Sequence, residues 1–504
     1  MISNTGRLLH AVGVFGGAIT MAYILVRRVL ALKRVSKKRT ITKWPPSPSP
    51  QHPILGHAPL MPPTGGPANE TKLLEWCNEL GSTTISYTLP LVGRFIATGD
   101  PDLAHYVLVH RNIPKSYVYK LTGPLLGTRS MLTAAHKEPH QSRRRMFHKG
   151  FQPGYLNQFC FEVMKEKTVN LLEACSATQG TPCRMLDLTT NYTSQIISAV
   201  AYGEDWDDHR HPARVSLDYI AGFLTKALSG SEPWNMFNPF IWSGAWKHHS
   251  DYHREMNAIV RRKMKDPSGN DIVSMALRDL MAENAELDEE TVATVIDNLK
   301  TIYIAGHETT ANLLSHAVWL LAQHPDVLLK IRTELDSVLD NGNWYAASTL
   351  QYKNCVYLDA VLKEVLRLYP PSSFSRWLSH TSANEEAVEW NGYRLDGATI
   401  LIAPFVMHRA ERNWGPQAHL FQPQRFLDDP NPKAFIPFSK GVYDCLGRSF
   451  GMMEAQVALA ALITGFDFEA VEPEKEFITC VMTLRNKYGC MMRLTPRNKA
   501  TETA

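Results

Sequence analysis

The sequence lacks the compositional biases that mark fibrous, disordered and multi-pass membrane proteins. Its 504 residues include 30 glycines and 31 prolines, which are spread along the chain without an internal repeat or a low-complexity region. The mean hydropathy of −0.21 is too polar for a protein that crosses a membrane many times. Hydrophobic residues at 44% and charged residues at 20% are typical of a folded globular chain. The length allows about three domains or one large catalytic fold.

Closely spaced cysteine pairs are also missing. The eight cysteines form no Cys-x-x-Cys pair and show none of the spacings that bind zinc. This pattern argues against a zinc module and against a disulfide framework. It agrees with a protein body that lies in a reducing compartment.

Positive charge is concentrated in one short segment. The chain has 53 basic and 49 acidic residues, a net charge of +4, but seven of the basic residues lie within residues 27–39, where there is no acid. Without these seven, 46 basic residues stand against 49 acidic ones, and the net charge is −3. The body is therefore close to neutral, and we expect no nucleic-acid partner.

An apolar run precedes the basic segment. Residues 8–26 carry no formal charge, and these nineteen residues are about enough to cross the hydrocarbon core of a membrane as a helix. In a cleaved signal peptide the basic residues precede the apolar core, whereas here they follow it. We therefore predict an uncleaved transmembrane anchor over residues 1–26, with the rest of the chain in the cytosol by the positive-inside rule. A buried first helix of the globular body is the alternative.

A single catalytic domain is predicted over residues 70–504, joined to the anchor by a basic and proline-rich linker over residues 27–69. The closely spaced prolines of this linker form a stiff, extended spacer, which would hold the domain at a set orientation to the membrane. Most of the domain shows helical periodicity, and strands are expected at residues 84–89, 94–98 and 388–402. The expected fold class is mainly α with small β-sheets.

An N-cap residue, Asp288, opens the longest predicted helix, which continues to the next proline. At the middle of this helix, Ala305 and Gly306 remove side-chain bulk, which would allow a flat ligand to approach the backbone. Glu308 and Thr309 follow directly and could form a proton relay. The alternative is a helix kink in which threonine bonds back to the preceding turn.

A cysteine in a glycine-containing loop gives the most specific signal. Cys445 lies in the segment F-S-K-G-V-Y-D-C-L-G, residues 438–447, just before a helix of apolar periodicity. The start of a helix favours a thiolate, and Gly441 and Gly447 permit tight turns and the close approach of a large planar group. A lone buried cysteine is usually inert, but the glycine frame argues for a thiolate ligand of haem iron.

Taken together, these segments resemble the cytochrome P-450 family of haem-thiolate monooxygenases. Residues 438–447 resemble its F-x-x-G-x-[RH]-x-C-x-G cysteine loop, and residues 305–310 resemble the oxygen-activation motif of its long central helix. Residues 364–367 are similar to its E-x-x-R element, and residues 421–426 to its P-E-R-F segment. The motifs occur in the family order along nearly the whole chain. The resemblance implies the cytochrome P-450 fold with one N-terminal transmembrane helix.

The resemblance also implies the roles of individual residues. Cys445 would be the axial iron ligand, and Glu308 and Thr309 would supply protons during catalysis. The haem would also contact Ala305, Gly306, Phe438, Gly441 and Gly447. Its propionates would bind His140, Arg144 and Arg376. A buried ion network would consist of Glu364, Arg367 and Arg425.

Two departures from the family pattern affect these expectations. Tyr443 stands where the family usually carries arginine or histidine, and a phenol can donate one hydrogen bond but brings no positive charge. Propionate binding would then depend more on the other residues, although Arg144 has basic neighbours and could instead belong to a solvated face. Gln424 replaces the usual glutamate of the P-E-R-F segment and could loosen the ion network.

The resemblance implies an activity that inserts one oxygen atom from O2 into a lipophilic small molecule. By analogy with anchored enzymes of this type, the molecule would belong to natural-product biosynthesis. The implied cofactor is haem b, and electrons from NADPH would arrive through a flavoprotein reductase, with or without a b-type cytochrome, at the endoplasmic reticulum membrane. The substrate pocket is expected to draw on residues 117–132, 302–309, 372–374 and 481–484. The charge-free aromatic stretch at residues 233–242 could dip into the membrane or pack in the core.

Two other functions remain open on the same fold. One is a haem-thiolate isomerase or dehydratase that needs no reductase, against which the intact Glu308–Thr309 pair argues. The other is a non-catalytic haem-binding protein or sensor, for which the departure at Tyr443 leaves room.

Overall fold

The predicted anchor and basic segment lie outside the part of the chain that the structure describes, as does most of the aromatic stretch before Trp242. Within the described part, none of the helices combines the length and the apolar character that crossing a bilayer requires. The computed structural model describes residues 43–63, 65–90, 92–206, 211–227, 239–284, 286–379, 388–481 and 483–497.

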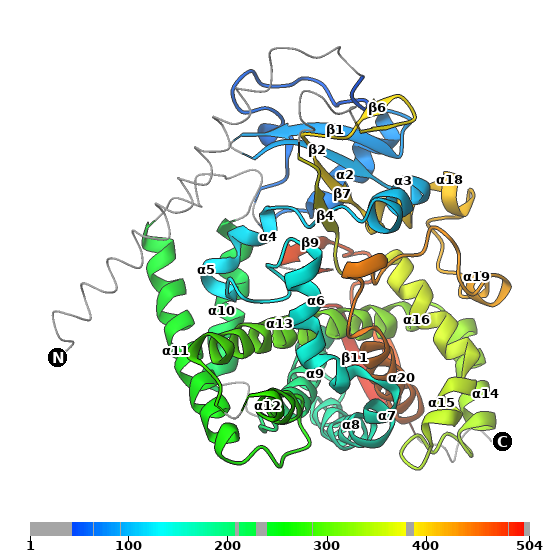
Figure 1. The fold of residues 1–504 in the computed structure, drawn as a ribbon. Coiled ribbons are helices and arrows are strands. Elements are labelled where there is room, and N and C mark those ends of the chain that lie inside the picture. Colours follow the sequence, from blue (N-terminus) through cyan, green and yellow to red (C-terminus); the bar gives the residue numbers. More distant parts are fainter. Residues whose placement is uncertain are drawn as a thin grey trace.

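Helices form most of the molecule and lie below a smaller sheet region in the view of Figure 1. The longest, α13, runs through this helical body and packs against α9, α16 and α20. Asp288 caps α13 as predicted, because its side chain accepts a hydrogen bond of 2.8 Å from the backbone N–H of Thr291. The longer helices are α2 (Asn69–Glu79), α6 (Lys137–Phe147), α8 (Phe161–Ser176), α9 (Met185–Tyr202), α10 (Pro212–Ala227), α11 (Pro239–Lys265), α12 (Ile272–Glu283), α13 (Glu289–Leu321), α14 (Pro325–Val338), α16 (Val356–Leu368) and α20 (Arg448–Gly465).

Short helices connect these long ones. Several begin at a proline, whose fixed φ and missing N–H suit the first turn of a helix. They are α3 (Pro101–His105), α4 (Val118–Leu121), α5 (Gly123–Leu126), α7 (Pro153–Tyr155), α15 (Thr349–Asn354), α17 (Pro404–Met407), α18 (Glu411–Trp414) and α19 (Gln424–Asp428), with 3₁₀ or π turns at Ala58–Leu60, Tyr106–His110, His148–Phe151, Leu156–Cys160 and Gly441–Tyr443.

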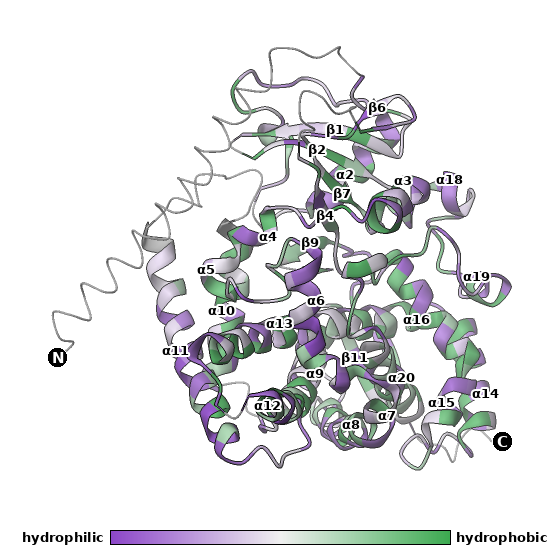
Figure 2. Cartoon of the chain, viewed as in Figure 1, coloured by the Kyte–Doolittle hydropathy of each residue, from purple (hydrophilic) through white to green (hydrophobic). Residues whose placement is uncertain are grey.

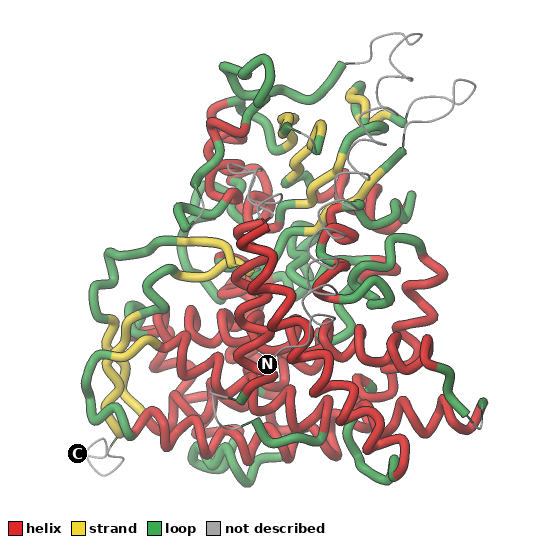
Figure 3. The backbone as a smooth tube through the Cα atoms, turned by 90° about the vertical axis from the view of Figure 1, so that its left-hand side faces the viewer, coloured by secondary structure: helices red, strands yellow, loops and turns green. Residues whose placement is uncertain are grey.

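The strands form small sheets at the top and along one side of the helical body (Figure 3). The largest sheet has the order β1-β2-β7-β4, in which β1 and β2 make an antiparallel hairpin and β7 runs parallel to β2. The predicted strand regions are confirmed, and so is the mainly helical class with small sheets. The strands are β1 (Thr84–Leu89), β2 (Gly93–Thr98), β3 (Cys183–Arg184), β4 (Phe374–Trp377), β5 (Glu389–Trp390), β6 (Tyr393–Arg394), β7 (Thr399–Ile402), β8 (Phe466–Ala470), β9 (Ile478–Val481), β10 (Thr483–Asn486) and β11 (Met491–Pro496).

Hydropathy explains how the helices are arranged. Figure 2 shows the surface helices α6 and α11 largely hydrophilic, whereas hydrophobic residues predominate on α20 inside the body. Residues such as Val200 on α9, Leu314 on α13 and Leu459 on α20 are fully buried. Burying an aliphatic side chain of this size contributes roughly 1.5–3 kcal/mol, so the α9–α13–α20 core holds the central helix firmly in place.

Candidate functional site

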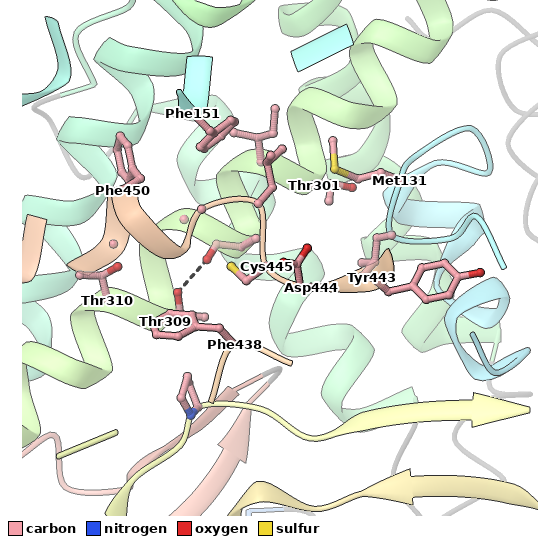
Figure 4. A pocket seen from close by; sticks show the side chains of 18 of the residues that line it. Met131, Phe151, Thr301, Thr309, Thr310, Phe438, Tyr443, Asp444, Cys445 and Phe450 are labelled. Atoms are coloured by element: carbon pink, nitrogen blue, oxygen red, sulfur yellow. Dashed lines mark hydrogen bonds between the residues drawn. The ribbon is translucent and has the colours of Figure 1, made fainter. Parts of the chain in front are cut away.

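An apolar cavity of about 240 Å³ lies between the middle of α13 and the loop that precedes α20. Small-molecule and cofactor sites commonly occupy roughly 300–1,000 Å³, so this cavity is near the lower end of their range. Its lining brings together residues far apart in the sequence, among them Met131, Thr309 and Cys445 (Figure 4).

Cys445 is exposed on the cavity wall, and Figure 4 shows its side chain among the others that line the cavity. The loop is closed by a hydrogen bond of 2.9 Å from the Cys445 N–H to the Phe438 carbonyl oxygen. Gly441 turns the loop with a φ of +77°, and a Cβ there would lie 2.3 Å from the Leu108 carbonyl oxygen, so only glycine fits. Although the Cys445 side chain is exposed to the cavity, it lies deep inside the protein, and this burial raises the pKa of its thiol, whereas the Gly447 backbone N–H acts in the opposite direction.

Two small residues leave the opposite walls of the cavity bare. Ala305 is exposed although it lies at the middle of α13, because its side chain faces the cavity. At Gly447 an added Cβ would meet nothing closer than a Phe151 ring carbon at 3.9 Å. Gly306 also lines the cavity, but a Cβ there would lie 2.9 Å from the Ile197 side chain, so this glycine serves the packing of α9 on α13 as well.

The two predicted proton-supplying residues lie in different surroundings. Thr309 lines the cavity, and its Oγ1 donates a hydrogen bond of 2.8 Å to the Ala305 carbonyl oxygen (dashed line in Figure 4). This is the bond from threonine to the preceding turn that was the alternative to a proton relay, and the same hydroxyl also lies on the cavity wall. Glu308 is buried outside the cavity lining, with its Oε1 3.3 Å from Nη1 of Arg485 on β10. Burial raises the pKa of Glu308, and neighbouring His307 and Arg485 act to lower it.

One edge of the cavity carries an excess of positive charge. The predicted residues His140 and Arg144 line this edge, and Arg144 pairs with Asp444 at 2.9 Å. Lys115, which the sequence analysis missed, is buried at the same edge and donates a hydrogen bond of 2.7 Å to the Met131 carbonyl oxygen. Burial, with repulsion from three nearby arginines, lowers the pKa of Lys115 to about 7. No sequence signal marks this residue as a site residue.

Tyr443 does not offer its hydroxyl to the cavity. The phenol O–H donates a hydrogen bond of 3.0 Å to the Ala135 carbonyl oxygen, and Figure 4 shows the ring pointing away from the Cys445 sulfur. The single hydrogen bond that a phenol can donate is therefore used within the protein. Arg376 is buried against the Tyr443 ring and is absent from the cavity lining.

The predicted ion network is built around Glu364 on α16. Its two carboxylate oxygens accept bonds from Arg367 at 2.6 and 2.8 Å, and Arg425 approaches at 3.7 Å. Both members of the inner pair are fully buried. Gln424 lies on the exposed side, where it bonds to Asp428, so it takes no part in the network.

The substrate pocket prediction is matched only in part. Met131 and Leu132 line the cavity, as does Ile302, whereas the segment 372–374 does not, although the adjacent Pro371 does. Among the described residues of 481–484, none lines it. Asn298 of α13 accepts a hydrogen bond of 2.7 Å from the Met131 N–H and so fixes this wall of the cavity.

Comparison with known proteins agrees with this architecture. Residues 45–492 match the Cytochrome P450 family. Cytochrome P450 4V2 of Mus musculus is 26% identical over 526 residues, which cover 96% of this chain and 95% of the mouse protein. Cytochrome P450 3A9 of Rattus norvegicus is 25% identical over 402 residues, or 74% of this chain and 76% of the rat protein. A cytokinin hydroxylase of Arabidopsis thaliana is 32% identical over 231 residues, and the match spans 43% of its length.

The fold and the site together define a class of protein, namely a mainly helical enzyme whose apolar cavity faces a cysteine. Within that class, the chain belongs to the cytochrome P450 family of monooxygenases, because the family match covers most of its length.

The residues around the cavity fit the haem that this family implies. A soft sulfur ligand faces the cavity, Ala305 and Gly447 leave room on opposite walls, and the cation edge suits the two carboxylates of a haem. Two buried nitrogens at that edge, His140 Nδ1 and Arg376 Nε, have no hydrogen-bond partner among the described residues. Buried polar atoms without partners are rare in proteins, and acidic groups of a bound cofactor would satisfy them.

Proposed function

We propose that Cys445 is the axial ligand of a haem b iron, and that the chain oxidises a lipophilic small molecule, of natural-product type, with O2 and with NADPH-derived electrons from a flavoprotein reductase. The observation that carries the proposal is the Cys445 sulfur on the wall of an apolar cavity whose opposite wall holds Ala305 and Thr309. Thiolate coordination would deprotonate the sulfur outright, whatever the pKa of the free thiol.

Haem with a thiolate ligand supplies the activation of O2 for transfer of one oxygen atom. The side chains of this chain would control protons and water around that chemistry. Thr309 Oγ1 can release its 2.8 Å bond to the Ala305 carbonyl oxygen and hold a proton at the cavity wall. Glu308 would carry protons to this point, since its partner Arg485 is 32% exposed and so connects the buried carboxylate with solvent. The apolar lining limits the water that reaches the site.

A carbon monoxide difference spectrum of the reduced protein tests the ligand. We expect a strongly red-shifted Soret band in the natural protein and its loss in Cys445→Ala. Cys160→Ala is the matched control, because Cys160 is fully buried away from the cavity lining and should leave the band unchanged. A red-shifted band that persists in Cys445→Ala would refute the assignment.

The proton role of Thr309 has its own test. Thr309→Ala should keep its haem but divert electrons from product to hydrogen peroxide, so that product formed per NADPH consumed falls several-fold. Thr301→Ala changes a second threonine of the cavity wall and should leave this ratio close to that of the natural protein. Tight coupling in Thr309→Ala would remove Thr309 from the role. The substrate itself is best sought by co-expression with a reductase and profiling of new oxygenated metabolites.

Membrane attachment is a separate part of the proposal. We propose that residues 1–26 anchor a single catalytic domain, residues 70–504, to the endoplasmic reticulum through the linker 27–69. The support is the charge-free run at residues 8–26 followed by seven basic residues. Deletion of residues 1–26 should move the protein from an alkaline-washed membrane fraction to the supernatant. An unchanged distribution would contradict the anchor.

A further inference from the structure

Two buried basic side chains lie side by side next to the cavity. Lys115 and Arg376 are partners in an antiparallel bridge, which is flanked by backbone bonds of 3.2 Å from Ser116 to Ser375 and 2.9 Å from Trp377 to Pro114. They are 8% and 2% exposed, and within the described part of the chain neither forms an ion pair with a carboxylate. Like charges directly opposite each other across a strand pair are destabilising, so this arrangement needs a compensating partner.

The ring of Tyr443 supplies part of that compensation. Its centre lies 5.3 Å from the Lys115 ammonium nitrogen and 5.0 Å from the central guanidinium carbon of Arg376. Cations within about 6 Å of an aromatic centre are attracted by the negative face of the ring, more strongly when they are shielded from water. The imidazole of His140 packs edge-on against the same ring, with the ring centres 4.8 Å apart.

The position of this ring is itself fixed. The Tyr443 hydroxyl donates to the Ala135 carbonyl oxygen at 3.0 Å, and the backbone N–H of Lys115 donates to the same oxygen at 3.1 Å. One carbonyl group therefore ties the phenol to the segment that carries Lys115. This bond adds to the packing of the ring against Lys115, Arg376 and His140, which by itself keeps the ring in place.

We infer that Tyr443 is a positioning residue, whose ring holds Lys115 and Arg376 together as a binding site for the two carboxylates of the haem. The inference rests on the proposed haem site and deepens it. Lys115 lines the cavity, and the Arg376 guanidinium, whose Nε has no partner among the described residues, is held against the same ring, so the two positive charges would meet the cofactor at one edge. The aromatic ring thus acts through the cations and makes no polar contact of its own with the cofactor.

The test measures haem loss from the holoenzyme to an excess of apomyoglobin, followed at the Soret band. Tyr443→Leu removes the ring, and we expect haem to leave roughly ten-fold faster or more, which corresponds to about 1.4 kcal/mol or more. Tyr443→Phe keeps the ring and removes only the hydroxyl, so its rate should stay within about three-fold of the natural protein. Phe95→Leu is the control for loss of a buried aromatic side chain, because Phe95 stacks on Tyr87 outside the cavity lining and none of the described cations lies over its ring.

A second comparison covers the case in which Tyr443→Leu yields too little protein. Lys115→Met removes one of the two cations that the ring holds, so it should speed haem loss by itself, and a rate within about three-fold of that of the natural protein would refute the inference. In addition, the reduction potential of the haem should fall in Tyr443→Leu, because less positive charge then lies near the carboxylates, and should stay near the natural value in Tyr443→Phe.

The outcomes separate this inference from the proposed function. If the reduced, carbon monoxide-bound samples keep the thiolate spectrum while Tyr443→Leu loses haem no faster than the natural protein, the positioning role is refuted and the thiolate assignment stands. Equal acceleration in Tyr443→Phe and Tyr443→Leu also refutes it, since the hydroxyl and not the ring would then matter. Absence of the thiolate spectrum in the natural protein would instead refute the haem site on which both depend.

Discussion

Neutralising Glu364 should destabilise the protein far more than neutralising an exposed glutamate in a pair of the same spacing. Glu364 and Arg367 are three residues apart on α16, both side chains are fully buried, and the guanidinium lies 2.6 Å from the nearer carboxylate oxygen. In Glu364→Gln the guanidinium stays buried without its counter-charge. Breaking a buried pair in this way costs about 3–5 kcal/mol.

The chain provides a matched control in Lys72 and Glu75. This pair has the same three-residue spacing and a nitrogen–oxygen distance of 2.8 Å, but its side chains are 27% and 58% exposed. Water already solvates these charges, so Glu75→Gln should cost about 0–1 kcal/mol. In both pairs the substitution removes the charge of a glutamate that lies three residues from its cation, and the main difference is burial, although the cation is an arginine in the first pair and a lysine in the second.

Thermal unfolding at one fixed scan rate is the assay. Unfolding entropy grows with chain length at roughly 2.1 cal/mol/K per residue, so for 504 residues a change of 1 kcal/mol moves the midpoint by about 1 °C. We therefore expect a fall of about 3–5 °C for Glu364→Gln and about 1 °C or less for Glu75→Gln. If both variants shift the midpoint equally, the argument from buried charge is wrong.

Three further predictions concern the site. Gly441→Ala should destabilise the cysteine loop by about 2–6 kcal/mol, because alanine is strained at a φ of +77° and its Cβ would collide with a backbone oxygen. The ratio of Soret to protein absorbance should therefore fall, and normal haem loading would contradict this prediction. Arg485→Gln removes a positive charge that lowers the pKa of Glu308, and without it this pKa should rise further. The acid limb of the pH profile of product formation should then move to higher pH, and a shift to lower pH would show that the sign is wrong. Asn298→Ala leaves the Met131 N–H without its acceptor, which costs about 1–3 kcal/mol, so amide hydrogen exchange in this wall should accelerate roughly ten-fold, and unchanged exchange would refute the role of Asn298.

Local sequence patterns were sufficient to predict the long helix, the hairpin and the candidate iron ligand. Asp288 and the apolar periodicity after it predict a helix whose observed bounds are Glu289–Leu321, because capping and periodicity act within a few residues. The hairpin at β1 and β2 follows for the same reason. The segment around Cys445 carries its signal in glycine spacing, since Gly441 is required by a turn inside the loop itself.

The surroundings of the candidate catalytic residues could not be predicted from local sequence patterns. Although they are adjacent in sequence, Thr309 lines the cavity and Glu308 does not, and only the packing of β10 decides that Glu308 meets Arg485. Gly306 was expected to make room for a ligand, yet its missing Cβ also makes room for a side chain of α9. A partner more than a hundred residues away leaves no mark in local spacing.

The amino-acid sequence alone determined the helical class, the cysteine loop and the motif order, since each depends on residues within one turn or one helix. The tertiary structure decided the electrostatics of the cavity edge. Lys115, Arg376 and Tyr443 come from three distant segments, and a bridge between strands and one shared carbonyl oxygen bring them together. Charge compensation depends on distances in space, and those distances are set only when the whole chain has packed.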